Sequence, residues 1–165
     1  MHPLHEVAPA FVVMAHSIVW CAAATVDEKH RPWSRILHPF WEWNGQSLVG
    51  WVGVTPTASM RTHLHENPYV SCSYWNDAHD TCSAEANATL SFDDETRERV
   101  WHLFKNTPPP LGYDPAMTPV WNKPTDDDYA VLRLDPWRLR VFPGAKMLWE
   151  ATADLDILTW RAEDA

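Results

Sequence analysis

Glycine and clustered positive charge are both scarce in this chain. Only 5 of its 165 residues are glycine, and its 13 lysines and arginines are outnumbered by 22 aspartates and glutamates, which gives a net charge of −9. Nucleic acids and anionic membrane surfaces are bound through basic patches, so neither is expected as the main partner. The sequence also contains no glycine-rich phosphate loop, no nucleotide-binding glycine fingerprint and no nucleophile elbow. Kinase and hydrolase functions therefore have no support.

Cysteines and long apolar runs are also few. The chain has three cysteines, Cys21, Cys72 and Cys82, without C-x-x-C spacing, and an odd number suits a reducing compartment better than a set of disulfides. We expect all three to be small core residues. No segment approaches the roughly 18 apolar residues of a membrane span, and the N-terminus lacks the basic start and apolar run of a signal peptide. A cytoplasmic protein without a membrane partner is therefore expected.

Tryptophan and proline, in contrast, are abundant, with 11 and 14 residues. Three of the tryptophans and two of the prolines lie in the segment PWSRILHPFWEW, residues 32–43. The length fits a single domain over residues 1–165, and a chain of this size buries roughly 70% of its unfolded surface on folding. A hydrophobic core is thus expected without disulfides.

The first half of the chain predicts a helix followed by three strands. Apolar residues recur at helical spacing within residues 1–17, and SIVWCAAATV then indicates a buried strand that ends at Asp27. The polar segment DEKHRP connects it to a second strand over residues 32–43. Asn44-Gly45 is a strong hairpin signal, so the second strand should pair antiparallel with a third strand after it. Pro39 cannot donate a ladder hydrogen bond, so the second strand must be interrupted or at an edge there.

The middle of the chain predicts two helices separated by a pair of strands. A helix after Pro56 can be capped by Thr57 or Ser59, and two alternating strands follow Asn67-Pro68. The best helix pattern in the sequence is FDDETRERVWHLFKN, which has acidic residues in its first turn, Lys105 in its last turn and an apolar stripe.

The last third of the chain begins with a proline-rich loop. Residues 107–128 contain six prolines and cannot form a regular element, so they are expected to be a lid, a binding loop or a disordered segment. Two strands broken at Asp135-Pro136 are predicted next, and a C-terminal extension, residues 145–165, can add a last strand or two. The order of elements indicates an α+β fold, mainly β, built as an antiparallel barrel with peripheral helices.

Three segments follow one another along the chain, CAAATVDEKHRPWSRILHPFWEWNGQSLVGWVGV, HLHENPYVSCSYW and CSAEANATL. In their order and spacing they resemble the pyridoxamine 5'-phosphate oxidase-like family of FMN-binding split β-barrels. The first resembles the family's opening strands, the second its short helix and following strand, and the third a later strand. The resemblance runs from about Ile18 to Phe142. It implies a homodimer of six-stranded Greek-key barrels, with FMN bound at the subunit interface.

The resemblance also implies a set of cofactor-binding residues. Arg35 corresponds to the strand arginine that holds the flavin phosphate, residues 36–38 and 51–55 would line the ring, residues 57–61 would form the phosphate end, and Glu85 would approach the ring. The implied set is Arg35, Ile36, Leu37, His38, Trp51, Gly53, Thr55, Thr57, Ser59, Arg61 and Glu85. Trp121, Trp137 and Arg138 are candidates for contact with a substrate or for a lid, because loop and strand-break positions are rarely at the centre of a core.

One position departs from the family pattern. The usual helix lysine falls on Met60, and the adjacent Arg61 points about 100° away on a helix. Phosphate binding would then rest on Arg35, on the hydroxyls of Thr57 and Ser59, and on the helix N-terminus, whose free N–H groups favour an anion.

Each candidate residue also has a structural interpretation. Arg35 can face solvent or pair with a carboxylate such as Glu42, Glu85 can be a charge at the rim of its strand, and His38 can lie on a polar outward face. A metal site built from His63-x-His65 and a third histidine is not expected, since residues two apart on a helix point to different faces.

The sequence therefore favours an FMN-dependent oxidoreductase that acts on an unknown small molecule. The flavin supplies the redox chemistry in such proteins, so no catalytic residue is assigned. A deazaflavin-dependent reductase is one alternative. A non-enzymatic dimer that has lost the flavin phosphate site and binds haem or another small ligand is a second, with Met60 as its main support.

Overall fold

The computed structural model describes the backbone of residues 1–149 and 157–163 and the side chains of residues 1–146 and 157–163. Its elements, in chain order, are α1 Leu4–Ile18, β1 Cys21–Val26, β2 Pro32–Leu37, β3 Phe40–Trp43, β4 Leu48–Val54, α2 Ala58–Glu66, β5 Tyr69–Trp75, β6 Thr81–Ser91, α3 Asp94–Asn106, the short 3-10 helix η1 Pro115–Met117, β7 Ala130–Phe142, α4 Gly144–Trp149 and β8 Leu158–Arg161. None of the helices described is both long and apolar enough to cross a membrane.

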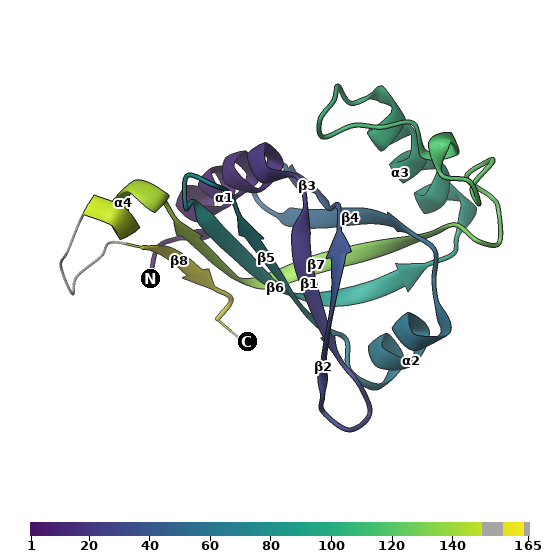
Figure 1. Ribbon diagram of the computed structural model, residues 1–165, viewed down its shortest axis with the longest axis horizontal. Coiled ribbons are helices and arrows are strands. Elements are labelled where there is room, and N and C mark those ends of the chain that lie inside the picture. Colours follow the sequence, from purple (N-terminus) through teal and green to yellow (C-terminus); the bar gives the residue numbers. More distant parts are fainter. Residues whose placement is uncertain (150–156, 164–165) are drawn as a thin grey trace.

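The strands form one antiparallel sheet in the order β2-β1-β5-β6-β7-β4-β3, with β8 paired to β7. β2 and β3 stand at opposite ends of this order, yet only His38 and Pro39 separate them in the sequence. A single bent segment therefore supplies both ends of the sheet, and β1 and β2 cross β6 and β7 in the view of Figure 1. The predicted split barrel of six strands is confirmed, with β2 and β3 as the two halves of one strand and β8 as an addition.

The bend at Pro39 agrees with the predicted interruption of the second strand. β2 pairs with β1 and β3 pairs with β4, so the chain changes partners where proline removes an N–H donor. The two halves of PWSRILHPFWEW consequently contribute to different parts of the barrel wall.

One prediction about the later strands was wrong. Pro136 does not break its strand, because β7 continues for 13 residues and a register shift opposite Glu85 and Ala86 accommodates the proline. The C-terminal extension adds one strand, β8 Leu158–Arg161, as predicted, and helix α4 precedes it. The rest of that prediction, at residues 150–156 and 164–165, lies outside the described residues.

The first strand also starts later than predicted. Helix α1 continues to Ile18 and a tight turn follows, so that β1 begins at Cys21 and Trp20 lies outside the strand.

Small side chains fill the barrel where β1, β5 and β6 face its interior. The buried small residues there include Cys21, Ala23, Cys72, Cys82, Ala84 and Ala86. Helix α1 closes one end of the barrel with Phe11, whose ring lies 5.0 Å from that of Trp41 and 6.2 Å from that of Tyr74. The three cysteines are free and buried, as predicted.

A second apolar cluster holds α3 and the proline-rich loop against the outside of β4 and β7. It contains Trp51, Val100, Trp101, Phe104, Trp121, Tyr129 and Val131. Trp121 comes from the loop, and its indole N–H donates to the Thr55 hydroxyl at 3.0 Å and to the Asp128 carbonyl at 2.9 Å. The loop is therefore anchored on the sheet, next to the C-terminal end of β2.

Candidate functional site

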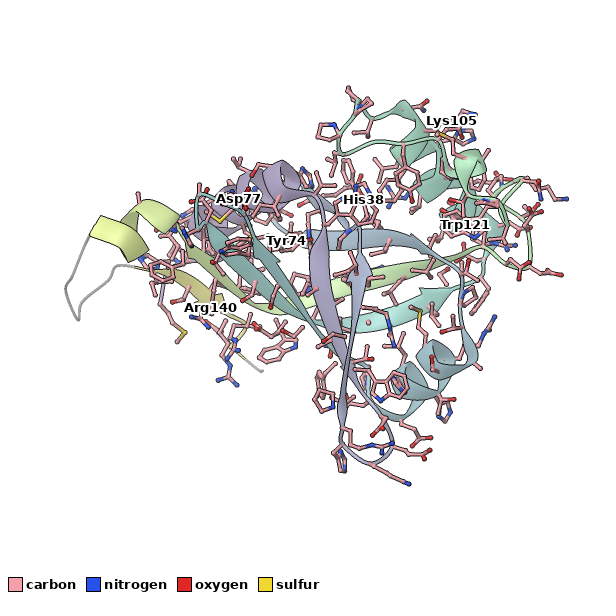
Figure 2. All side chains as sticks on the ribbon, viewed as in Figure 1. His38, Tyr74, Asp77, Lys105, Trp121 and Arg140 are labelled. Atoms are coloured by element: carbon pink, nitrogen blue, oxygen red, sulfur yellow. The ribbon has the colours of Figure 1, made fainter. Side chains whose placement is uncertain are left out.

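A groove of about 560 Å³ lies between the end of β2, strand β4 and the proline-rich loop. We call it the β2–β4 groove, and its lining residues are Trp20, Ile36, Leu37, His38, Val52, Gly53, Pro110, Tyr113, Met117, Thr118, Pro119 and Trp121. Four residues predicted to bind the cofactor, Ile36, Leu37, His38 and Gly53, meet here with Trp121 of the loop. Figure 2 shows His38 and Trp121 beside α3.

A strained turn brings Trp20 to this groove. Val19 has φ 74° and ψ −61°, and the Trp20 N–H donates to the Ile18 carbonyl at 2.9 Å, which makes a γ-turn of the rare kind with positive φ. A β-branched residue at positive φ is an outlier that packing elsewhere must hold in place. The turn leaves Trp20 57% exposed, with its ring 4.8 Å from that of His38.

Aromatic rings surround His38 on several sides. Besides Trp20, the ring of Tyr113 lies 5.3 Å from the imidazole and the ring of Phe104 lies 5.5 Å from it. This burial lowers the pKa of His38, and a backbone hydrogen bond at Leu111 opposes the effect only in part. The imidazole is therefore neutral at neutral pH, and its Nε2 has no hydrogen-bond partner.

Gly53 allows the backbone of β4 to approach the two tyrosines beside the groove. A Cβ atom at this position would lie 3.0 Å from Cε2 of Tyr129 and 3.3 Å from the hydroxyl of Tyr113. Burial raises the pKa of Tyr113 to about 12, so this phenol stays neutral. Since no aspartate, glutamate, lysine or arginine among the described residues lines the groove, the space they enclose is uncharged at neutral pH.

Arg35 lies on the barrel side of β2, opposite Ala23 of β1. It is partly buried, burial lowers its pKa, and it has no hydrogen bond or ion pair with any described residue. The interpretation that it pairs with Glu42 was wrong. That carboxylate accepts from the Trp51 indole at 2.6 Å and from Arg99 at 3.1 Å.

The start of α2 presents hydroxyls and free backbone N–H groups. Thr57 caps the helix by accepting from the Met60 N–H at 3.3 Å, and its hydroxyl lies 3.2 Å from that of Ser59. The first N–H groups of a helix have no partner within it, which makes this end suitable for an anion.

The side chains of Met60 and Arg61, the next residues of α2, are engaged elsewhere. Met60 is 4% exposed and packs into the barrel core. The Arg61 guanidinium donates to the Pro56 carbonyl at 3.1 Å and lies 4.6 Å from the ring of Phe92, in a separate pocket. The structure therefore does not bring Arg61 to the β2–β4 groove.

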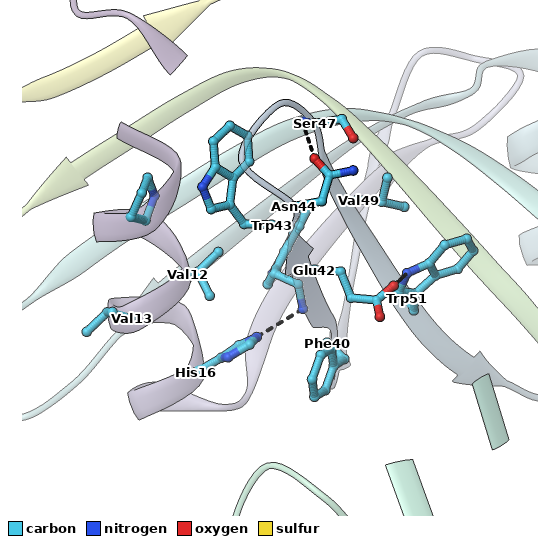
Figure 3. Close-up of a pocket in the computed structure, with 12 residues that line it drawn as sticks. Val12, Val13, His16, Phe40, Glu42, Trp43, Asn44, Ser47, Val49 and Trp51 are labelled. Carbon is cyan, nitrogen blue, oxygen red and sulfur yellow. Dashed lines mark hydrogen bonds between the residues drawn. The ribbon is translucent and has the colours of Figure 1, made fainter. Parts of the chain in front are cut away.

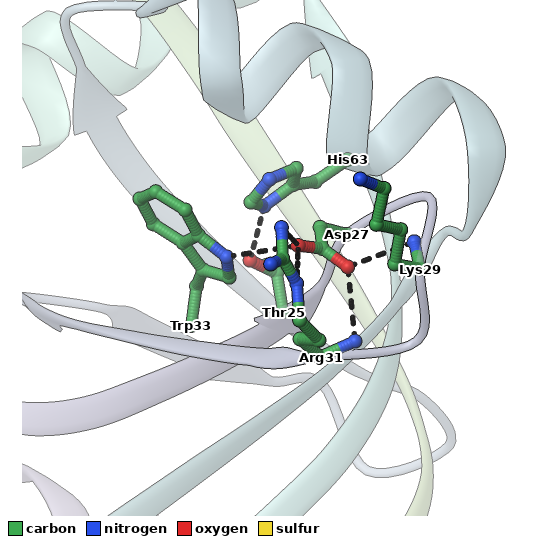
Figure 4. Close-up of polar contacts among 6 residues, drawn as sticks. All are labelled: Thr25, Asp27, Lys29, Arg31, Trp33 and His63. Carbon is green, nitrogen blue, oxygen red and sulfur yellow. Dashed lines mark hydrogen bonds and ion pairs between the residues drawn. The ribbon is translucent and has the colours of Figure 1, made fainter.

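Helix α2 packs against the face of β2 that carries Arg35. Its residue His63 bonds to the Thr25 hydroxyl at 3.0 Å and contacts the ring of Trp33 at 5.3 Å (Figure 4). Trp33 and Arg35 are two residues apart on β2 and so share a face. This packing places α2 and Arg35 on the same side of the sheet.

Asp27 fixes the hairpin that carries β2. Its carboxylate accepts from the backbone N–H groups of Lys29 and Arg31, each at 2.9 Å, from the Arg31 guanidinium at 2.8 Å and from the Trp33 indole at 3.3 Å (Figure 4). The Arg31 side chain, followed by the backbone N–H donors, holds the pKa of Asp27 well below its usual value. The sequence of this segment predicts only a polar connection between two strands.

Three predicted residues lie away from the groove, on the outer face of β6 and β7. Glu85 accepts from Arg138 at 2.9 Å, and the Arg138 guanidinium lies 5.6 Å from the ring of Trp137. Neighbours of Glu85 in β6, such as Ala84 and Ala86, point into the barrel, so Glu85 points outward. Within one chain, these residues and the β2–β4 groove are separate.

A second groove, of about 660 Å³, lies between α1 and the β3–β4 hairpin (Figure 3). Trp51 is among its lining residues and donates to Glu42, while His16 accepts from the backbone N–H of Trp41 at 3.0 Å. The polar groups in this groove thus bond to one another. The β2–β4 groove is the better candidate site, because it holds a buried polar atom without a partner.

Comparison with known proteins gives a match at the level of three-dimensional structure. No family model matches the sequence, and no curated protein matches it. A protein related to general stress protein 26, of the pyridoxine phosphate oxidase family, from Clostridium acetobutylicum superposes with a TM-score of 0.66 and 13% identity over 92% of each chain. A pyridoxamine 5'-phosphate oxidase-related, FMN-binding protein from Nostoc punctiforme gives a TM-score of 0.64 and 14% identity, over 98% of this chain and 97% of that one.

An F420 reductase is also similar, with a TM-score of 0.55 and 13% identity, over 78% of this chain and 94% of that one. At such identities the similarity shows the fold. The chain therefore has the split-barrel fold of the pyridoxamine 5'-phosphate oxidase-related proteins, as its sequence strings predict.

Proposed function

We propose that this chain, which has the split-barrel fold of the pyridoxamine 5'-phosphate oxidase-related proteins, belongs to that family and is an FMN-dependent oxidoreductase acting on a small molecule. The β2–β4 groove is the observation that carries this proposal. It combines about 560 Å³ of uncharged, largely apolar space with the strand residues Ile36, Leu37 and His38. Cofactor sites commonly have this size, apolar walls and few polar groups.

Arg35 is the residue we assign to the flavin phosphate. An arginine that is partly buried without an anionic partner is costly, and a phosphate would satisfy its guanidinium through two parallel hydrogen bonds. Thr57, Ser59 and the N-terminus of α2 supply the remaining donors. Met60 removes the lysine of the family pattern, so a single arginine carries the positive charge.

The chain's own residues bind and orient the reactants in this proposal. Bound FMN supplies the redox chemistry by accepting or donating two electrons as a hydride. Ile36 and Leu37 form one wall for the ring, Val52 and Gly53 of β4 line the other side, and the loop residues Tyr113 and Trp121 limit the access of water. No side chain in the groove is charged, so an uncharged substrate is expected.

We further propose that the protein is a homodimer formed through the outer face of β1, β2 and β5. This face carries large exposed apolar side chains, Ile36 at 66%, Tyr69 at 56% and Trp75 at 57%, among small residues such as Ser73. Apolar surface gathered in this way commonly marks an interaction site. In a dimer formed through this face, Ile36 brings the interface to the edge of the β2–β4 groove.

The visible absorption spectrum of the purified protein tests the flavin proposal. We expect bands typical of a flavin, or quenching of flavin fluorescence when FMN is added at micromolar concentration. Binding of F420 in preference to FMN would instead identify a deazaflavin-dependent reductase. If no flavin binds and added haemin gives a Soret band, the proposal is wrong and the non-enzymatic alternative holds.

A further inference from the structure

The Nε2 atom of His38 is a buried polar atom without a hydrogen-bond partner. The residue is only 7% exposed, and it lines the β2–β4 groove. Buried polar groups in folded proteins nearly always have a partner, so an exception inside a groove points to a ligand group that completes it.

The charge state of His38 shows which kind of group is missing. Burial keeps the imidazole neutral by lowering its pKa, and the Leu111 backbone acts in the opposite direction, as a carbonyl does when it accepts a ring N–H. Since Nε2 has no partner, we assign that proton to Nδ1. Nε2 is then a hydrogen-bond acceptor, and its missing partner is an N–H or O–H donor.

The imidazole has little freedom to find a donor elsewhere. The rings of Trp20, Tyr113 and Phe104 lie within 4.8 to 5.5 Å of it. The indole N–H of Trp121, the other donor-bearing ring of the loop wall, is already bonded to Thr55 and to the Asp128 carbonyl. Neither Trp20 nor Tyr113 donates to Nε2 in the structure, so this acceptor is open to a donor from a ligand.

We propose that His38 accepts a hydrogen bond from the N3–H group of the flavin ring and thereby sets which edge of the ring lies at the end of β2. The inference rests on the proposed function. An oxidised flavin ring has a single N–H group, at N3, so a ring in this groove offers Nε2 one donor. A ring without that donor leaves a buried acceptor desolvated and unpaired, which weakens its binding.

The test compares the affinities of FMN and 3-methyl-FMN, measured by quenching of flavin fluorescence. The wild-type protein is expected to bind 3-methyl-FMN about 10-fold more weakly, because the methyl group removes the N3–H donor. His38→Phe, which retains a ring but no acceptor, should lose this preference. His38→Gln, whose side-chain carbonyl can accept, should retain part of it. His102→Phe is the control, since His102 is an exposed histidine on α3.

Equal affinity of the wild-type protein for the two flavins would overturn the assignment of His38 while leaving FMN binding intact. A full preference that persists in folded His38→Phe would also overturn it, since the methyl group would then be rejected elsewhere. If His38→Phe does not fold, the wild-type comparison and His38→Gln decide the question. Failure of the wild-type protein to bind either flavin contradicts the proposed function itself.

Discussion

The guanidinium of Arg31 binds one carboxylate oxygen of Asp27 through two nitrogens, Nε at 2.8 Å and Nη2 at 2.7 Å. The other carboxylate oxygen accepts two backbone N–H groups of the same hairpin. The pair therefore fixes where β2 begins. This strand carries Arg35 and leads into His38 at the candidate site.

Replacement of Asp27 by asparagine is expected to lower the free energy of unfolding at neutral pH. The folded-state pKa of Asp27 lies below its usual value of 3.8, so its contribution to stability is fully present above that value and declines as the pH falls below it. Urea unfolding of the wild-type protein and Asp27→Asn should differ at pH 7, and the difference should shrink below about pH 4. Asp77→Asn, at an exposed turn, is the control. A difference that does not change with pH would contradict a role for the ionised carboxylate.

Removal of the Arg35 guanidinium is expected to weaken FMN binding without unfolding the protein. Hydrogen bonds to charged groups are worth more than neutral ones, so Arg35→Ala should raise the dissociation constant about 10- to 100-fold. Arg61→Ala should leave it unchanged, because that side chain lies over Phe92. Fluorescence titration measures both variants, and equal losses in the two would exclude a specific phosphate contact at Arg35.

Restoration of the family's lysine at position 60 is not expected to improve FMN binding. Met60 packs in the barrel core, so Met60→Lys places an ammonium group among apolar side chains and should lower the free energy of unfolding by about 2–4 kcal/mol. Met60→Leu, which nearly conserves volume, should cost less than about 1.5 kcal/mol. Chemical denaturation gives both values. Tighter FMN binding by folded Met60→Lys would show that the side chain reaches the phosphate after all.

The ring of Trp41 leaves no room for a side chain at residue 50. A Cβ atom at residue 50 would lie 2.8 Å from Cζ3 of that ring, and the ring is held in place by a 2.8 Å hydrogen bond from its indole N–H to the Tyr74 hydroxyl. Gly50→Ala should therefore destabilise the protein by about 1–3 kcal/mol. Ser47→Ala, on the exposed turn before β4, should have almost no effect. Unfolding followed by tryptophan fluorescence compares the two, and an equally stable Gly50→Ala would mean that the ring can move.

The outer face of β5 provides a test of the proposed dimer. Ser73 is exposed and pairs across the sheet with Ala22 and Ser83, so an arginine there adds bulk and charge at the centre of the face. Ser73→Arg is expected to elute as a monomer in size-exclusion chromatography, whereas the wild-type protein elutes as a dimer. A dimer that survives Ser73→Arg would place the interface on another face.

The fold was predictable from the sequence wherever a local signal decided the structure. Asp93 caps α3 by accepting from the Thr96 N–H, and the apolar stripe of that helix is buried, as its sequence pattern predicts. Gly45 adopts φ 93° in the hairpin turn that Asn44-Gly45 indicates. These elements depend on interactions between residues that are close in sequence, so the sequence alone predicts them.

Features that depend on distant partners were not predictable in this way. Proline at residue 136 indicates a break, but the strand continues because β7 bulges at Trp137 and keeps its pairing with β6, a strand about 50 residues away in sequence. The positive φ of Val19 has no signal in its residue type, so Trp20 was expected in a buried strand and was missed as a groove residue.

The candidate site was predictable only in part. Ile36, Leu37, His38 and Gly53 do meet in one groove, because strand pairing fixes their positions. Arg61 lies against Phe92, a contact that the family resemblance could not indicate. Glu85 and Arg138 form an ion pair on a different face of the sheet, so a role for them at the groove would require a second copy of the chain.

The pairing of β4 with β7, in which Val52 lies opposite Leu132, has a consequence for the order of folding. The β3–β4 hairpin closes over a short turn, whereas the β4–β7 ladder joins residues about 80 positions apart. Formation of this ladder therefore has a larger entropic cost of loop closure. The proline-rich loop lies between these two strands in the sequence, so it can cover the groove only after the ladder has formed. The groove is therefore expected to assemble late, and a ligand that fills it is expected to stabilise the last part of the barrel to form.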